Sequence, residues 1–204
     1  MRDIDVRRSL CEEVTRRHQG DADTVIVNEL GLCQGAARVD VAVINGFIHG
    51  FEIKSERDTL DRLPHQSDVY SRALDLATMV TAKKHLSKIR LIVPRWWGLV
   101  VAENADNCIV LRELRTAKKN PSVDAFAQAQ LLWRDEALHE LERRALAHGM
   151  RAKTRKALWE KLARHVDREE IGSIVRFHLK RRLRLRAVEQ PASSDDWYPP
   201  SSMS

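Results

Sequence analysis

The sequence has few cysteines, few glycines and no long hydrophobic run, and each shortage excludes a class of protein. Its three cysteines are widely spaced and form no C-x-x-C pair, so they indicate neither a disulfide framework nor a zinc site. They also fall short of the thiolate ligands of an iron–sulfur cluster. Eight glycines leave little room for a glycine-rich phosphate loop. No apolar run approaches the roughly 18 residues of a membrane span, and the first residues are too charged for a secretory signal. We therefore expect a cytoplasmic protein without a membrane partner.

Positive charge is unevenly distributed along the 204 residues. Residues 143–186 hold 15 Lys and Arg against 4 Asp and Glu, whereas residues 1–142 hold 20 against 22. A block this basic is typical of an element that binds a polyanion, although a solvated helical face would have the same composition. The block does not distinguish DNA from RNA. The residues that we expect to contact nucleic acid lie at its end and are Lys180, Arg181, Arg182 and Arg184.

The most informative stretch runs from Asp40 to Lys54. It reads as two short apolar strands joined at Asn45-Gly46, with a carboxylate where the first begins and Glu52-Ile53-Lys54 where the second ends. Two carboxylates and an ammonium at one end of a sheet can hold a divalent metal ion and meet a phosphodiester. The alternative is an edge strand with a solvated Glu–Lys face, but charges in so apolar a strand are costly to bury without a partner. The pattern favours a metal-dependent nuclease.

This site requires a particular strand register. Because side chains alternate along a strand, Glu52 and Lys54 share a face, and Asp40 must lie opposite Glu52 to reach the same ion. A two-residue turn at Asn45-Gly46 would shift the pairing by one residue and put Asp40 on the wrong face. We therefore predict either a three-residue loop centred on Gly46 or a β-bulge at Gly50.

The spacing of apolar residues predicts an α/β segment followed by helices. We divide the chain into a nuclease-like domain at residues 1–120, a basic helical nucleic-acid-binding region at 121–188 and a tail at 189–204 that we expect to be disordered. The expected elements are a helix at 3–18, a strand at 24–30, the hairpin, a mostly helical stretch at 56–86 interrupted at Pro64, strands at 88–93, 99–102 and 109–114, and helices from 123 onward with breaks near 149 and 167.

The order of helix, three strands, helix and strand resembles the PD-(D/E)xK nuclease superfamily, whose restriction-endonuclease-like core is a mixed sheet flanked by helices. In that superfamily an acid begins the second strand and an acid-x-Lys motif lies in the third; here these are Asp40 and Glu52-Ile53-Lys54. Val39 stands where the superfamily has proline. Gln66-Ser-Asp-Val-Tyr70 resembles the Q-x-x-x-Y element of RecB-like exonucleases. The motifs are also similar to those of a group of small, uncharacterised bacterial and phage nuclease-like proteins.

The charge pattern and the resemblance imply a Mg²⁺ site, with Mn²⁺ as a substitute. Mg²⁺ prefers carboxylate oxygens, which Asp40 and Glu52 would supply, and the backbone carbonyl of Ile53 could add another ligand. The ion would lower the pKa of a bound water and neutralise charge in the transition state. Lys54 would orient the attacking water or stabilise the developing oxyanion.

Further residues are weaker candidates. Glu29 in the first strand is either a third metal ligand or a strand-end acid in solvent, and Glu12 or Glu13 on the first helix competes for that role. By resemblance, Gln66 belongs to the catalytic residues and would touch Lys54 or the nucleic acid. Tyr70, one helical turn later on the same face, would support it and help to bind nucleic acid.

Two main functional classes follow. The first is an active Mg²⁺-dependent nuclease that hydrolyses DNA phosphodiester bonds in repair, recombination or a phage or defence context. The second is a non-catalytic DNA-binding or regulatory protein that keeps the nuclease fold. An RNA-processing enzyme is a third class, because a basic block does not identify the nucleic acid. Each class is compatible with a homodimer or a partner protein, and only the metal site separates the first class from the second.

Overall fold

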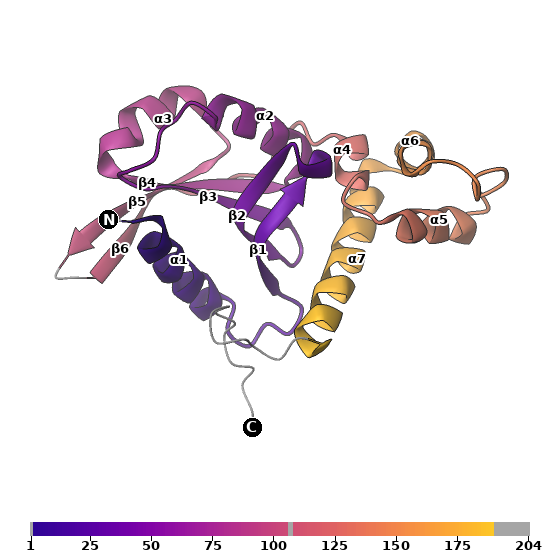
Figure 1. Ribbon diagram of the computed structural model, residues 1–204, viewed down its shortest axis with the longest axis horizontal. Coiled ribbons are helices and arrows are strands. Elements are labelled where there is room, and N and C mark those ends of the chain that lie inside the picture. Colours follow the sequence, from indigo (N-terminus) through magenta and orange to yellow (C-terminus); the bar gives the residue numbers. More distant parts are fainter. Residues whose placement is uncertain (1, 106–107, 190–204) are drawn as a thin grey trace.

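A six-stranded mixed sheet forms the centre of the molecule (Figure 1). The computed structural model describes residues 2–105 and 108–189, with the side chains of the last helix described as far as Leu185. The strands are β1 (Val25–Leu32), β2 (Ala37–Ile44), β3 (Ile48–Lys54), β4 (Leu76–Ala82), β5 (Gly98–Ala105) and β6 (Cys108–Arg115). They lie in the sheet in chain order. The β3–β4 and β4–β5 pairs are parallel, and the other pairs are antiparallel.

Helices cover both faces of this sheet, which confirms the predicted α/β class with a mixed sheet flanked by helices. One face carries α1 (Asp3–Arg17), where Val6, Leu10 and Val14 recur at helical spacing and pack against β2 and β3. The larger core lies on the other face. The helices that contribute to it are α2 (Leu63–Ala73), α3 (Leu86–Ile92), α4 (Ala125–Ala129), α5 (Arg134–Arg143), α6 (Arg155–His165) and α7 (Arg168–Glu189).

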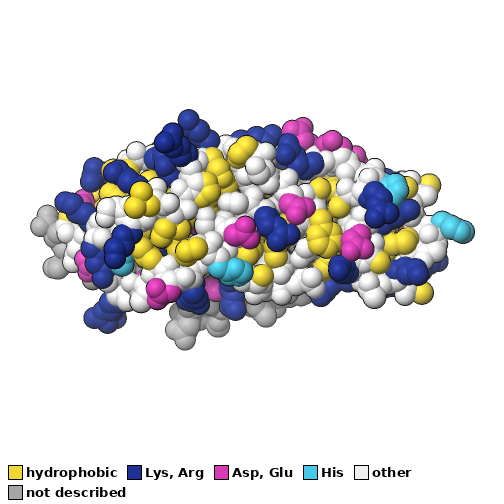
Figure 2. Space-filling model, turned by 90° about the horizontal axis from the view of Figure 1, so that it is seen from above, with side chains coloured by type: hydrophobic (Ala, Val, Ile, Leu, Met, Phe, Trp, Pro, Cys, Tyr) yellow, Lys and Arg dark blue, Asp and Glu magenta, His cyan; other side chains and the backbone are white. Residues whose placement is uncertain are grey.

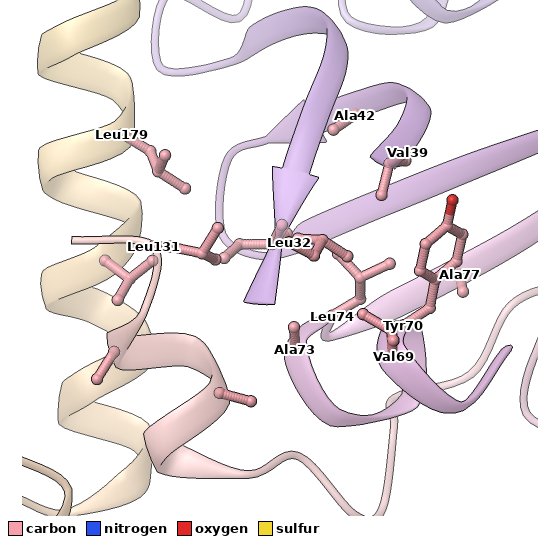
Figure 3. Close-up of a cluster of buried hydrophobic side chains, with 14 of the residues drawn as sticks. Leu32, Val39, Ala42, Val69, Tyr70, Ala73, Leu74, Ala77, Leu131 and Leu179 are labelled. Atoms are coloured by element: carbon pink, nitrogen blue, oxygen red, sulfur yellow. The ribbon is translucent and has the colours of Figure 1, made fainter. Parts of the chain in front are cut away.

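The larger core continues from the sheet into the C-terminal helices. Figure 3 shows Leu179 of α7 and Leu131 pointing towards Leu32 of β1, with Leu74 and Tyr70 beyond it. The hydrophobic cluster therefore crosses the boundary that we placed at residue 120. The division into two domains stays a prediction.

The β2–β3 register is the one that a shared acidic site requires. Ile44 pairs with Ile48 and Val41 with Phe51, which places Asp40 opposite Glu52. The connection is a three-residue loop centred on Gly46, so the first of the two predicted devices is confirmed. Gly50 forms no bulge.

Two assignments between residues 74 and 93 are wrong. The stretch 56–86, expected to be mostly helical, contains strand β4, because Leu76–Ala82 is a continuous buried run whose periodicity cannot separate a strand from a helix. The expected strand at 88–93 is instead helix α3, which buries only Ile89 and leaves Leu91 89% exposed. A one-sided pattern of this kind suits a short surface helix.

The C-terminal region is helical, as predicted. Asp167 caps α7, because its carboxylate accepts the N–H of Glu169 at 2.8 Å. The predicted disordered tail lies outside the described residues from residue 190 onward. None of the described helices is long and apolar enough to cross a membrane.

Candidate functional site

Glu52 is the centre of a buried polar cluster. Its side chain is 2% exposed and lies on β3, beside the crossover helix α2. Oε1 of Glu52 accepts hydrogen bonds from Nζ of Lys54 at 2.5 Å and from Nε2 of Gln66 at 2.6 Å. Oε2 lies 2.5 Å from the hydroxyl of Tyr70, which also lies 2.6 Å from the carbonyl oxygen of Arg38. The structure thus brings together Glu52, Lys54, Gln66 and Tyr70. Gln66, which was predicted to touch Lys54 or the nucleic acid, bonds Glu52 instead.

The amide of Gln66 is oriented by this cluster. Its nitrogen must face Glu52, because an amide oxygen in that position would be repelled by the carboxylate and could donate no hydrogen bond to it. Oε1 of Gln66 is therefore turned away, and it is buried without a hydrogen-bond partner among the described residues.

Tyr70 contributes to the site differently from the prediction. It is fully buried, stacks on Trp97 at a centroid distance of 5.7 Å, and its hydroxyl is used within the protein. Burial and the neighbouring charge of Glu52 raise its pKa above the usual range, so it remains a protonated donor. Tyr70 supports Glu52, and it is not placed to contact nucleic acid.

Asp40 lies where β2 and β3 separate, and both its carboxylate oxygens are engaged. Oδ2 accepts the backbone N–H of Ile53 at 2.7 Å, and Oδ1 accepts Nη2 of Arg7 at 2.7 Å. Burial and the nearby charge of Glu52 raise the pKa of Asp40 to about 6, although Ile53 and Arg7 oppose this shift. The two acids are therefore close enough to influence each other, as the predicted site requires.

Arg7 of α1 is the functional residue that the sequence reading missed. Its guanidinium bonds Oε1 of Glu29 and the backbone oxygen of Asp40, both at 2.9 Å, and lies 3.6 Å from Asp3. Burial lowers the pKa of Arg7, but the charges of Asp40, Asp3 and Glu29 raise it, so the group is a permanent cation. Glu29 is 46% exposed and also pairs with Arg38. We expected an acid on this helix, Glu12 or Glu13; Glu13 instead pairs with Arg16 and Arg17.

The predicted metal site fits Mg²⁺ in residue type but not in arrangement. Asp40 and Glu52 are suitable ligands, yet every one of their carboxylate oxygens already accepts a proton donor. Arg7 puts a positive charge where a divalent ion would meet Asp40 and Glu29. Among the described residues, no group of three His, Cys, Asp or Glu side chains is arranged to hold an ion. Ile53 contributes its N–H to this site, and its predicted role as a carbonyl ligand stays untested.

The predicted nucleic-acid residues of α7 have different surroundings. Lys180 bonds Asp23 at 2.6 Å, and Arg184 bonds the carbonyl oxygen of Ala22 at 2.8 Å. Arg182 is 13% exposed, lies over the ring of Trp133 at 4.3 Å and bonds the carbonyl of Leu131, so it holds α5 to α7 and is not placed at the surface. Arg181 is exposed and has no ion pair with any described residue.

Lys180, Arg181 and Arg184 border an open depression of about 720 Å³ along α7, and Arg182 does not. On the face shown in Figure 2, Lys and Arg side chains are scattered among acidic and hydrophobic ones. The depression is instead lined by one acid, Asp23, together with Arg176, Lys180, Arg181, Arg184, Ser173, Phe177 and Leu185.

The comparison with known families decides the classification. The family described as "Bacteriophage P4 protein cII" matches residues 2–189. The chain belongs to the bacteriophage P4 protein cII family. Protein cII of Enterobacteria phage P4 is 25% identical over 136 residues, which cover 67% of this chain and 51% of that protein. The chain thus spans about half the length of the curated relative that it matches. No solved structure matches it.

Membership of the protein cII family corrects the earlier resemblance. The motifs around Asp40, Glu52 and Gln66 suggested the PD-(D/E)xK nuclease superfamily, but the matching family and the matching relative are phage protein cII. The assignment to that superfamily, and with it the classification as a nuclease and hydrolase, is wrong. The motifs misled because a few polar residues around one buried glutamate specify a local cluster, not a family.

Proposed function

We propose that this cII-family chain is a DNA-binding regulatory protein that acts without catalysis. The observation that carries the proposal is the gathering of cations on α7. A segment with 15 basic and 4 acidic residues folds so that four of its cations border one open depression opposite a single acid. A concave surface that is mainly positive attracts phosphates and raises the rate of encounter with a polyanion.

The surroundings of Asp40 support the non-catalytic part of this proposal. Arg7 and the N–H of Ile53 occupy the carboxylate, and Lys54 is committed to Glu52. A protein that regulates by binding does not need Asp40 or Glu52 to release these hydrogen-bond partners. The cluster then serves to fix β2, β3, α1 and α2 relative to one another.

The proposal is tested by DNA binding at several salt concentrations. We expect a labelled duplex to raise fluorescence anisotropy with the wild-type chain, with log Kobs falling linearly as log salt rises. The double variant Arg181→Ala/Arg184→Ala should reduce the steepness of that line by about 2, because each lost phosphate contact contributes roughly 0.9. The matched control, Lys88→Ala/Arg90→Ala, removes the same charge from exposed positions on α3 and should change the slope much less.

The same protein samples test whether the chain acts without catalysis. Linear and single-stranded DNA would be incubated with Mg²⁺ or Mn²⁺ beside Asp40→Ala and Lys54→Ala. DNA that stays intact with all three proteins, while binding persists, supports the regulatory role. Cleavage by the wild type that both variants abolish contradicts the non-catalytic part of the proposal. Equal loss of binding in the α7 and α3 double variants contradicts the assignment of α7 as the binding surface.

A further inference from the structure

Four exposed residues form a stripe along α7 that is slightly inclined to the helix axis: Ser173, Phe177, Arg181 and Leu185. They are spaced four apart, so they lie on one helix face, and all of them line the open depression. Phe177 is 56% exposed and Leu185 is 55% exposed. The apolar residues of α7 that pack into the protein, such as Val175 and Leu179, belong to the opposite side of the helix.

Phe177 has a fixed support despite its exposure. Its ring meets the ring of His178 edge-on, with centroids 5.2 Å apart. His178 is 3% exposed and is held by Oε1 of Glu140 at 2.8 Å. A ring backed in this way presents its outer surface to solvent without the freedom of an unsupported side chain.

Cations surround the ring of Phe177, and they differ in whether they form ion pairs with acidic residues. Asp23 binds Lys180 and lies 3.7 Å from Arg184, so one acid restrains these two cations beside the stripe. Arg181, one turn after Phe177, has no partner among the described residues. Arg176 lies 3.5 Å from Asp75, an acid outside the lining. The lining itself holds four cations and one acid, and the unpaired charge of Arg181 lies next to an exposed aromatic face.

Building on the proposed function, we propose that this stripe binds single-stranded nucleic acid, with a base stacked on Phe177 and a neighbouring phosphate on Arg181. Residues four apart on a helix are separated by about 6 Å along its axis, so one nucleotide can reach both side chains. Aromatic stacking accepts any base, and a guanidinium pairs with phosphate through parallel hydrogen bonds. Leu185 extends the apolar edge for the next base.

A duplex and an apolar protein segment both fit this surface less well. In a duplex the base faces are covered by stacking and only groove edges and phosphates are presented, so Phe177 would remain in contact with water or with charged phosphates. An apolar segment would cover Phe177 and Leu185 but would strip water from Arg181 without offering a partner. A single strand supplies both an aromatic face and an anion.

The test compares Phe177→Leu with wild type in anisotropy titrations of a labelled dT oligonucleotide, a U oligonucleotide and a DNA duplex. Loss of one stacked base should weaken single-strand binding roughly 5- to 100-fold and leave duplex binding within about twofold. Phe177→Tyr keeps the ring and should bind like wild type. Leu91→Ala removes an even more exposed apolar side chain, 89% against 56% for Phe177, from α3 and serves as the control.

The outcomes separate this inference from the proposed function. Selective loss with the dT oligonucleotide assigns the site to single-stranded DNA, and selective loss with the U oligonucleotide assigns it to RNA. If Phe177→Leu changes no titration, or weakens single strand and duplex alike, the stacking site is overturned while DNA binding stands. If the wild type binds none of the three probes, both the inference and the proposed function fail.

Discussion

Nη2 of Arg7 lies 2.7 Å from Oδ1 of Asp40, and the same guanidinium bonds Glu29. A cation from the first helix thus holds two acids that the sequence assigns to a metal ion. Arginine keeps its charge at any physiological pH and presents several donors in one plane, so this arrangement satisfies both carboxylates permanently. We expect Arg7 to compete with any divalent cation for Asp40.

Replacing Arg7 should therefore increase affinity for divalent ions. In Arg7→Gln the guanidinium charge is gone and Asp40 and Glu29 regain free oxygens, so Mn²⁺ should bind at least tenfold more tightly than to wild type, as measured by isothermal titration calorimetry or by electron paramagnetic resonance. Arg8→Gln, an exposed neighbour on the same helix, is the control for lost positive charge. Equal Mn²⁺ affinity in wild type and Arg7→Gln would show that the acids are not held by Arg7 in competition with metal.

The raised pKa of Asp40 gives the stability of the protein a specific pH dependence. In the folded state Asp40 has a pKa of about 6, against an ordinary pKa of 3.8. Its contribution to the free energy of unfolding is therefore largest below pH 4 and falls as the pH rises through 6. Asp40→Asn should remove this fall. Urea unfolding of both proteins at pH 4.5 and pH 7.5 should show that the free energy of unfolding of Asp40→Asn rises relative to that of wild type at the higher pH.

If the free energy of unfolding of Asp40→Asn instead fell relative to that of wild type at pH 7.5, the predicted direction of the pH dependence would be reversed. It would mean that the ion pair with Arg7 outweighs burial and the charge of Glu52, and that the folded-state pKa of Asp40 lies below its ordinary value.

The hairpin shows how far sequence reasoning reaches. Alternation of side chains and one required pair, Asp40 opposite Glu52, were enough to predict either a loop centred on Gly46 or a bulge at Gly50, and the loop is the one that forms. These are local constraints, because the two strands are adjacent in the chain. Gln66 was also assigned to this site, but its partner is Glu52 and not the predicted Lys54 or nucleic acid.

Contacts set by tertiary packing could not be predicted in this way. Which side chain of α1 reaches Asp40 depends on the angle at which the helix crosses the sheet, so Arg7 carries no signal of its own in the sequence. Arg182 reads as one more cation in a basic run, and only the placement of Trp133 reveals that it is largely covered. Strand β4 was assigned as helix because it is buried along its whole length and shows no alternation.

Tyr70→Phe tests the supporting role of that hydroxyl. The change removes a donor to Glu52 and leaves the ring stacked on Trp97, so we expect a loss of about 1 to 2 kcal/mol in the free energy of unfolding. Nucleic-acid affinity should stay unchanged, because the residue is fully buried. Weaker binding with unaltered stability would instead place the Tyr70 hydroxyl in contact with the nucleic acid.

Gly50→Ala should destabilise the protein by about 1 to 3 kcal/mol through overpacking. An added Cβ would lie 2.6 Å from Cδ1 of Leu74 and 3.0 Å from Cγ1 of Val39, inside a core that has no free space. Gly46→Ala is the matched control in the same hairpin, because nothing lies within 4 Å of its added Cβ. Chemical denaturation of both variants measures the difference, and equal stabilities would show that β3 can move away from α2 at little cost.

Glu140→Ala tests how firmly α5 is joined to α7. Glu140 is buried at 2% exposure, where Arg144 and His178 both bond its carboxylate. Burial raises the pKa of Glu140, but the hydrogen bonds from His178 and Arg144 outweigh burial and lower it, so the group is charged. Its loss takes the carboxylate partner from the buried His178 and one of two carboxylate partners from Arg144, which keeps Glu170. We expect a cost of about 3 to 5 kcal/mol. Glu142→Ala, which breaks the exposed pair with Arg151, should cost less than about 1 kcal/mol.

The shape of the Glu140→Ala unfolding curve bears on the organisation of the chain. Because the core runs from β1 through Leu131 to Leu179, we expect one cooperative transition in which the sheet and the C-terminal helices unfold together. Near-ultraviolet circular dichroism follows the buried Trp97 beside the sheet and Trp159 in α6. A second transition at lower denaturant, seen in wild type but lost when Trp159 is replaced by Phe, would instead show that the helices after residue 120 unfold as a separate unit.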